Sequence, residues 1–299
     1  MTNGCIRLRR NLCAPARAEV CAGAVLRCAY QKQSCVQFIN AQTIKLPRMS
    51  LSGYKDHIRT PGFNAGTMSN DWEPKKLTHD RDVEFTSTRW ISMRRTSSCP
   101  SPTSRRLPKR NRQSQKKDSY RFSKLHAELK QYSVTPDSTE ITTQSILEMF
   151  DEYMAKMDEA GVPTEGRIIY ATPTVRKIIK EAEGIQRVMS VSSAGGINRQ
   201  VHSLDDVQIK MVPAARMKTK YDFTTGCVPA SDAKQINFIL LHPSAVICRD
   251  KYSYIKLFTP GTDSRTADGY LYQNRNYGDL FLIENKVAGV AMNAEAVGA

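Results

Sequence analysis

Hydrophobic positions along the chain follow the periods of both strands and helices. The apolar run 236–241 has no helical spacing and is closed by His242-Pro243, which predicts a buried strand ending at a proline. Residues 167–171 predict a second strand. Thr172 then supplies an N-cap, and apolar residues at i, i+3, i+4 and i+7 over 173–182 predict an amphipathic helix.

The same patterns predict further elements of both kinds. Helices are expected over 119–131 and from Thr142 or Thr143 to Gly161, strands over 207–212 and 252–258, and a terminal hairpin from 280–283 and 287–292. Four acidic residues lie off the apolar stripe of the second helix and read as a solvated face: Asp151, Glu152, Asp158 and Glu159. Short helices and strands mixed in this way indicate an α+β fold.

Near the N-terminus the pattern favours an extended β-hairpin loop. Residues 36–46 and 77–85 have the character of strands, and the polar stretch 50–73 between them is rich in turn-forming residues. The two strands are expected to enclose this stretch as one long excursion.

Charge is distributed very unevenly. The chain of 299 residues has a net charge of +15, of which 1–35 supply +5 and 86–117 supply +10, so the remainder is neutral. With 40% hydrophobic residues a sizeable core is available. No apolar run approaches the ~18 residues of a membrane span, and no signal peptide is evident, so a soluble protein without an export signal is expected.

The two basic segments have unusual compositions. Residues 86–117 contain three prolines and almost nothing apolar after Met93, so they are expected to be disordered and without specific tertiary packing. Residues 1–35 hold five of the eight cysteines, at spacings that include no C-x-x-C. That spacing argues against zinc, and the missing export signal argues against disulfides.

Motifs that carry chemistry are missing from the sequence. Gly195-Gly196 fits neither nucleotide-binding glycine pattern, no G-x-S-x-G occurs, and His242 has no companion carboxylate at a known spacing. The alternating charges of 79–82 favour an exposed strand over a metal site. We therefore predict no catalytic, cofactor-binding or metal residues, no cofactor, and a protein that is not an enzyme.

Several stretches, taken in their order along the chain, nevertheless resemble one family, the major capsid proteins of tailed bacteriophages of the Hong Kong 97 type. The stretches are Gly62–Phe85, Gly161–Pro173, Pro213–Thr219, Lys234–Val246 and Tyr277–Val290. The resemblance covers about 36–85 and 118–292.

The resemblance implies a subunit with an axial domain, a peripheral domain and an extended β-hairpin loop. Its divisions are an N-terminal arm (1–35), the hairpin loop (36–85), a spine region (86–134), the axial domain (135–270), closing peripheral strands (271–292) and a tail (293–299). It also implies self-assembly into hexamers and pentamers of an icosahedral head around double-stranded DNA, with portal and scaffolding or protease proteins as partners. The protein would reside in the virion, and in the host cytoplasm before assembly.

The chain departs from this family where a long spine helix is implied. Over 86–117 the genetic code suggests a cause. If the reading frame is moved back by one base, the codon that spans Trp90 and Ile91 must encode Asp, and the codon that spans Met93 and Arg94 must encode Glu or Ala. We therefore predict that 86–117 is an out-of-frame translation between two compensating shifts. Residues 1–35 are a second candidate for such a shift.

A different class of function remains open at this point. A basic nucleic-acid-binding protein would use 89–117 as a phosphate-neutralising arm, although that arm has only Trp90 for base stacking. Salt-dependent DNA binding that is lost on deleting 86–117 would favour this alternative over a shell protein.

Overall fold

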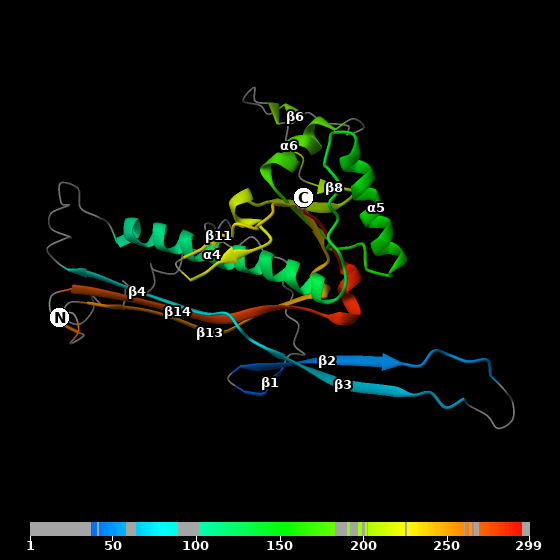
Figure 1. Ribbon diagram of the computed structural model, residues 1–299, viewed down its shortest axis with the longest axis horizontal. Helices are drawn as coiled ribbons and strands as arrows, with labels where there is room; N and C mark the ends of the chain where they lie inside the picture. Colours follow the sequence, from blue (N-terminus) through cyan, green and yellow to red (C-terminus); the bar gives the residue numbers. More distant parts are fainter. Residues whose placement is uncertain are drawn as a thin grey trace.

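The computed structural model shows an elongated molecule with a mixed sheet-and-helix body, a long helix and a projecting hairpin (Figure 1). It describes residues 37–40, 42–57, 64–88, 102–182, 190–191, 197–198, 201, 203–224, 226–259, 261–262, 265 and 269–294. Only the backbone is described at 37, 47, 49, 87–88, 102–114, 190–191 and 197–198. The predictions made for 1–35 and for Gly195-Gly196 lie outside these residues.

The body is built on a five-stranded sheet of order β15-β12-β5-β9-β8. Its strands are β5 (Ile168–Ala171), β8 (Ser203–Leu204), β9 (Val207–Met211), β12 (Ile236–Leu241) and β15 (Val290–Ala294). Strands β5 and β12 are buried along almost their whole length, as the continuous apolar runs predict. The sequence prediction of strands at 167–171, 207–212 and 236–241 is confirmed.

Helices cover both faces of this sheet. Alternate residues of β12 enter two cores: Ile239 and Leu241 meet the helix α4, and Phe238 and Leu240 meet α5 and α6. The helices are α4 (Pro102–Gln131), α5 (Ser145–Glu159) and α6 (Pro173–Glu181). This layering is the α+β architecture expected from the sequence.

Local capping at α5 and α6 follows the sequence closely. The Thr172 hydroxyl accepts a hydrogen bond from the Val175 amide at 3.4 Å, with proline next in the chain. At α5 the Thr142 hydroxyl accepts one from the Ser145 amide at 3.1 Å. The N-cap itself is Gln144, whose side chain makes no capping bond, so the predicted cap at Thr142 or Thr143 was placed one or two residues too early. Gly161 ends α5 with φ +69, a left-handed conformation that favours glycine.

A second, three-stranded antiparallel sheet of order β13-β14-β4 lies beside α4 (Figure 1). It consists of β4 (Asp80–Thr88), β13 (Val246–Phe258) and β14 (Gly269–Leu282). The predicted terminal hairpin is wrong: residues 280–282 end β14, and β15 pairs with β12 in the other sheet. The turn between them is a 3-10 helix, Glu284–Gly289, which redirects the chain into the other sheet.

The projecting hairpin pairs β2 (Thr43–Leu51) with β3 (Met68–Lys76). The short strand β1 (Gln37–Phe38) pairs with the opposite edge of β2. An extended hairpin was predicted here, but the pairing of 36–46 with 77–85 was wrong, because β2 pairs with β3. The first six residues of β3 lie within the stretch 50–73 that was taken for turns. The predicted strand 77–85 mostly forms β4, which pairs with β14. The polar sequence of β3 conceals it, because both of its faces are largely exposed.

Helix α4 begins well before the predicted start of the helix, Ser119. Residues 86–88 belong to β4 and 102–117 belong to α4, so the predicted disorder is wrong for both stretches, whereas 89–101 lie outside the described residues. Arginine, lysine and glutamine are good helix formers, and Pro102 stands at the first helical position, where proline is tolerated. Judging 86–117 by its apolar content alone overlooked this propensity.

The remaining short elements connect these layers. They are β6 (Ser190–Val191), β7 (Ile197–Asn198), β10 (Tyr221–Asp222), β11 (Val228–Pro229), and 3-10 turns at Ala214–Arg216 and Pro243–Ala245. None of the helices described has both the length and the apolar character needed to span a bilayer.

Candidate functional site

A polar junction forms where the hairpin, α4 and the three-stranded sheet meet. Residues 77–79 connect β3 to β4, so they join the projecting hairpin to the rest of the molecule. Leu77 is buried, and its amide donates to the Gln42 carbonyl oxygen at 2.7 Å. The direction of the hairpin therefore depends on how this connector is held.

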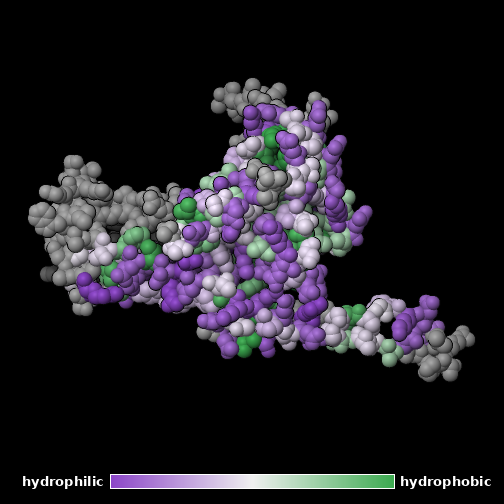
Figure 2. Space-filling model, viewed as in Figure 1, coloured by the Kyte–Doolittle hydropathy of each residue, from purple (hydrophilic) through white to green (hydrophobic). Residues whose placement is uncertain are grey.

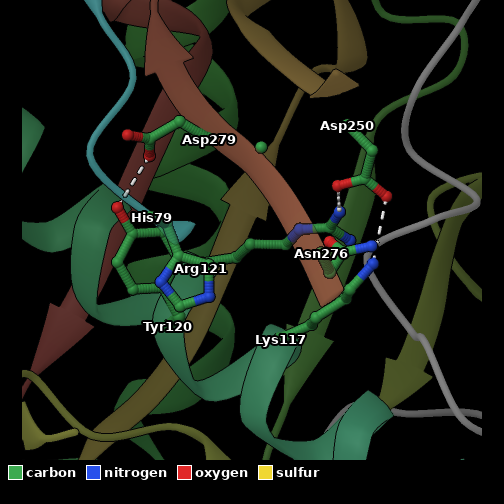
Figure 3. A pocket seen from close by; sticks show the side chains of 8 residues that line it. His79, Lys117, Tyr120, Arg121, Asp250, Asn276 and Asp279 are labelled. Carbon is green, nitrogen blue, oxygen red and sulfur yellow. Dashed lines mark hydrogen bonds and ion pairs between the residues drawn. The ribbon is translucent and has the colours of Figure 1, made fainter. Parts of the chain in front are cut away.

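Asp279, buried on β14, fixes the connector to α4 (Figure 3). Its Oδ2 accepts from the Thr78 amide at 2.8 Å and from the Thr78 hydroxyl at 2.9 Å. Its Oδ1 accepts from the Tyr120 hydroxyl at 2.8 Å. One carboxylate thus links three elements through hydrogen bonds to a charged acceptor, which are the stronger kind.

His79 and Gly278 complete the packing at this point. The His79 ring stacks on the Tyr120 ring with centroids 3.7 Å apart. The His79 carbonyl oxygen accepts from the Gly278 amide at 3.1 Å. A Cβ at Gly278 would lie 2.6 Å from the Arg249 carbonyl oxygen, so only glycine allows the strands to approach this closely.

A second carboxylate anchors the next turn of α4. Asp250 on β13 accepts from Lys117 Nζ at 3.1 Å and from Arg121 Nη2 at 3.4 Å (Figure 3). The side chains of Lys117, Tyr120, Arg121, Asp250 and Asp279 thereby line one small recess, together with His79. The last residue of the basic segment, Lys117, is held in place by this contact.

Burial sets the protonation state of the junction. Burial, with Arg81 next in importance, lowers the pKa of His79 to about 4, so the ring is neutral at neutral pH. Burial and the negative charge of Asp279 raise the pKa of Tyr120, which keeps its hydroxyl a donor. At neutral pH the junction therefore stacks a neutral imidazole on a protonated phenol.

We expect the protein to lose stability as pH falls from about 6.5 to about 4. His79 has its ordinary pKa of 6.5 when unfolded and about 4 when folded, so the unfolded state binds the proton first. The contribution of His79 to this loss should reach about 3 kcal/mol by pH 4. His126, whose pKa is also lowered to about 4 by burial, adds a loss of its own. Urea denaturation across this range should show a smaller loss for His79→Phe than for the parent, whereas a variant of the exposed His57, His57→Gln, should match the parent. If the free energy of unfolding falls equally steeply with decreasing pH in all three proteins, burial of His79 does not cause the loss.

The charged side chains of the junction are hydrogen-bonded to one another or to Thr78 and Tyr120. Within the part of the chain that is described, no three His, Cys, Asp or Glu side chains gather as metal ligands would. His242 caps its own turn: its Nδ1 lies 2.6 Å from the Ser244 hydroxyl, and its Nε2 lies 3.2 Å from the Glu165 carbonyl oxygen. What the junction can do is hold the hairpin at a fixed angle.

Sequence reasoning missed this junction and misjudged one of its members. Residues 79–82 were predicted to be an exposed strand, which is correct for 80–82 but wrong for His79, since that side chain is buried. Asp279 and Tyr120 drew no attention because they stand in ordinary strand and helix patterns. Gly278, a glycine within a strand, was the available signal for a close backbone approach.

The hairpin itself presents apolar side chains to solvent. The large exposed ones on or near its strands are Leu51, Tyr54, Met68 and Trp72. Leu51 and Met68 are directly opposite each other in the β2–β3 register. Exposed apolar groups at the end of a projecting element are typical of a surface that another chain covers.

Comparison with solved structures establishes the fold. The chain is similar to one in the capsid structure of the cyanophage P-SCSP1u (TM-score 0.62, 11% identity, covering 88% of this chain and 86% of that one). It is also similar to one in the mature capsid of bacteriophage PhiM1 (0.61, 10%, 87% and 83%) and to one from Microbacterium phage Oxtober96 (0.59, 11%, 92% and 91%). No protein-family profile and no curated protein sequence matches the chain. The chain thus has a mixed α+β fold of the phage capsid type, and the resemblance read from its sequence is confirmed at the level of fold.

Proposed function

We propose that this chain is the major capsid protein of a tailed bacteriophage or prophage, and that its role is structural rather than catalytic. The observation that carries the proposal is the extent of the likeness, which spans more than four fifths of this chain and of each capsid chain named above. A fold by itself does not prove function, but here the ordered sequence resemblance points to the same family.

The proposed domain division follows the sheets. The hairpin loop is β2–β3, and the peripheral domain combines α4 with β4, β13 and β14. The axial domain then runs from 135 to about 245 and includes β15, instead of ending at 270, because β13 pairs along its length with β14. Residues 1–35 remain the proposed N-terminal arm.

Assembly would repeat one heterologous contact around closed rings. The exposed apolar side chains of the hairpin would lie on a neighbouring copy, and the junction at Asp279 would set the angle of that contact. Rings of six and of five then close into an icosahedral head around double-stranded DNA, with portal and scaffolding or protease proteins as further partners. The protein would work without a cofactor, in the virion.

Electron microscopy of particles, together with the identity of the neighbouring genes, tests this function. Regular shells or capsomers from the chain with its displaced frame restored over 86–117, and flanking portal, protease and terminase genes, are the expected result. Salt-dependent DNA binding that disappears on deleting 86–117, without any ring or shell, would instead support a nucleic-acid-binding protein.

In the chain with its displaced frame restored over 86–117, we expect Leu51→Asp combined with Met68→Asp to abolish association into rings while leaving the fold intact. Both side chains are exposed, so the charges cost little within one subunit, but they would be buried against a neighbour. Sedimentation velocity measures association, and circular dichroism checks folding. Ser50→Asp with Ser69→Asp, the adjacent opposed pair, is the matched control. If the Leu51 and Met68 variant associates as the parent does, the hairpin is not part of the interface.

A further inference from the structure

Strand β13 forms an outer edge of the three-stranded sheet, and the second half of that edge is open (Figure 1). Just before this half, Lys251 donates to the Asn40 carbonyl oxygen and lies over the Phe38 ring, so the base of the hairpin sits beside the edge there. From Tyr252 to Phe258 the register with β14 is regular. Within the part of the chain that the structure describes, no strand pairs with the other side of 252–258.

The open stretch has the composition of a strand that pairs readily. Its sequence, Tyr-Ser-Tyr-Ile-Lys-Leu-Phe, contains three aromatic and two aliphatic residues, a single charge and neither proline nor glycine. The exposed fractions are 47% for Tyr252, 62% for Ile255 and 54% for Leu257. Hydrophobic surface is visible at the end of the sheet where β13 finishes (Figure 2). A long apolar edge with free backbone N–H and C=O groups is a surface on which another strand fits.

The opposite edge of the same sheet, β4, is built differently. Every second residue over its first half is acidic, and all three of these residues, Asp80, Asp82 and Glu84, are exposed. Charged side chains are a usual means of keeping an edge strand from pairing with another chain. The acidic row therefore protects β4, whereas the second half of β13 has only Lys256 for this purpose.

We propose that residues 252–258 are an interface at which β13 pairs antiparallel with β13 of a second copy, across a two-fold axis at Ile255. An axis perpendicular to the sheet brings side chains of one face opposite side chains of the same face. Because the open stretch has seven residues and Ile255 stands at its centre, this register pairs the stretch along its whole length. The two three-stranded sheets would then continue each other as one sheet.

Side-chain chemistry selects this register. At the axis Ile255 meets Ile255 of the second copy, so two exposed apolar side chains cover each other. The other pairs set no like charges together, and they are Tyr252 with Phe258, Ser253 with Leu257, and Tyr254 with Lys256. An axis shifted by one residue to Lys256 would bring two ammonium groups face to face.

This contact differs in kind from the one proposed for the hairpin. It is isologous, since the same residues stand on both sides of a two-fold axis, whereas the hairpin contact is heterologous. In a shell it would join one ring to the next, and that role rests on the proposed function. The pairing of two copies through β13 does not depend on a shell.

A lysine at the axis tests the pairing in the chain as written. A pair of seven-residue edges is a small interface, so the parent should dimerise with a dissociation constant of about 10 µM in sedimentation equilibrium. Ile255→Lys should weaken dimerisation by about tenfold or more, because two ammonium groups would then face each other. Val83→Lys is the matched control, since Val83 and Ile255 flank the same residue of β14 but Val83 lies on the β4 edge. Circular dichroism should show both variants folded.

Mixing two charge variants tests the position of the axis. Ile255→Glu alone should dissociate as Ile255→Lys does, but an equimolar mixture of the two should dimerise again, because only an axis at this residue brings Lys and Glu together. A monomeric parent, a Val83→Lys variant that dissociates like Ile255→Lys, or a mixture that stays monomeric overturns the proposal. These measurements concern dimers, so their outcome is separate from whether the protein forms rings and shells.

Discussion

Restoring the displaced frame over 86–117 should convert a chain that assembles poorly into one that builds regular shells. As written, this segment carries ten basic residues and no acidic one, which places like charges wherever subunits meet. In a frame set back by one base, the second base of each codon is the first base of a written codon, and every arginine codon has guanine as its second base. No written codon from Arg89 to Lys117 begins with guanine, so the displaced frame cannot encode arginine anywhere from 89 to 116. The restored segment would therefore lose all seven arginines that stand between 89 and 112.

The experiment expresses both versions and compares them by sedimentation and electron microscopy. The written chain should sediment mainly as small species with a folded body, because a domain with its own core survives damage elsewhere. Sequencing the gene across codons 86 to 117 is the direct control for the two shifts. Equal yields of regular shells from both versions would refute the frame-shift prediction and return the basic segment to the candidates for a functional arm.

Asp279→Ala should destabilise the protein by about 3 kcal/mol and release the hairpin from its fixed angle. The substitution leaves the Thr78 amide, the Thr78 hydroxyl and the Tyr120 hydroxyl without their shared acceptor in a buried site. Donors left unsatisfied in this way each cost about 1–3 kcal/mol, with relaxation and water entry offsetting part of the sum. Urea denaturation measures the stability, and amide exchange over 68–76 reports on the hairpin.

The matched control removes a carboxylate from an exposed pair. Asp80→Ala breaks the contact with Arg275, whose side chain is more than half exposed, so it should leave the free energy of unfolding nearly unchanged. Amide exchange should then remain as in the parent. If the Asp279 variant behaves like this control, the junction is not what holds the hairpin.

The elements that local pattern specifies were predictable from sequence. Strands β5 and β12 were recognised because both of their faces are buried, so the sequence shows an uninterrupted apolar run. The start of α6 was recognised because Thr172 makes its capping bond to a residue only three positions away. Interactions that close within one turn leave their signature in neighbouring residues, and the α+β class followed from them.

Pairing partners and the junction were decided by tertiary structure alone. Strand β3 is largely exposed on both faces, so no buried face marks it in the sequence, and its pairing with β2 is what makes it a strand. Residues 80–88 have the pattern of a hairpin strand, but they pair with β14. Thr78 and Asp279 stand 201 positions apart. His79 is buried because Tyr120 stacks on it, and nothing in its own neighbourhood of alternating charges indicates this. Contacts between distant segments depend on how whole elements pack, and no periodicity along the chain records that packing.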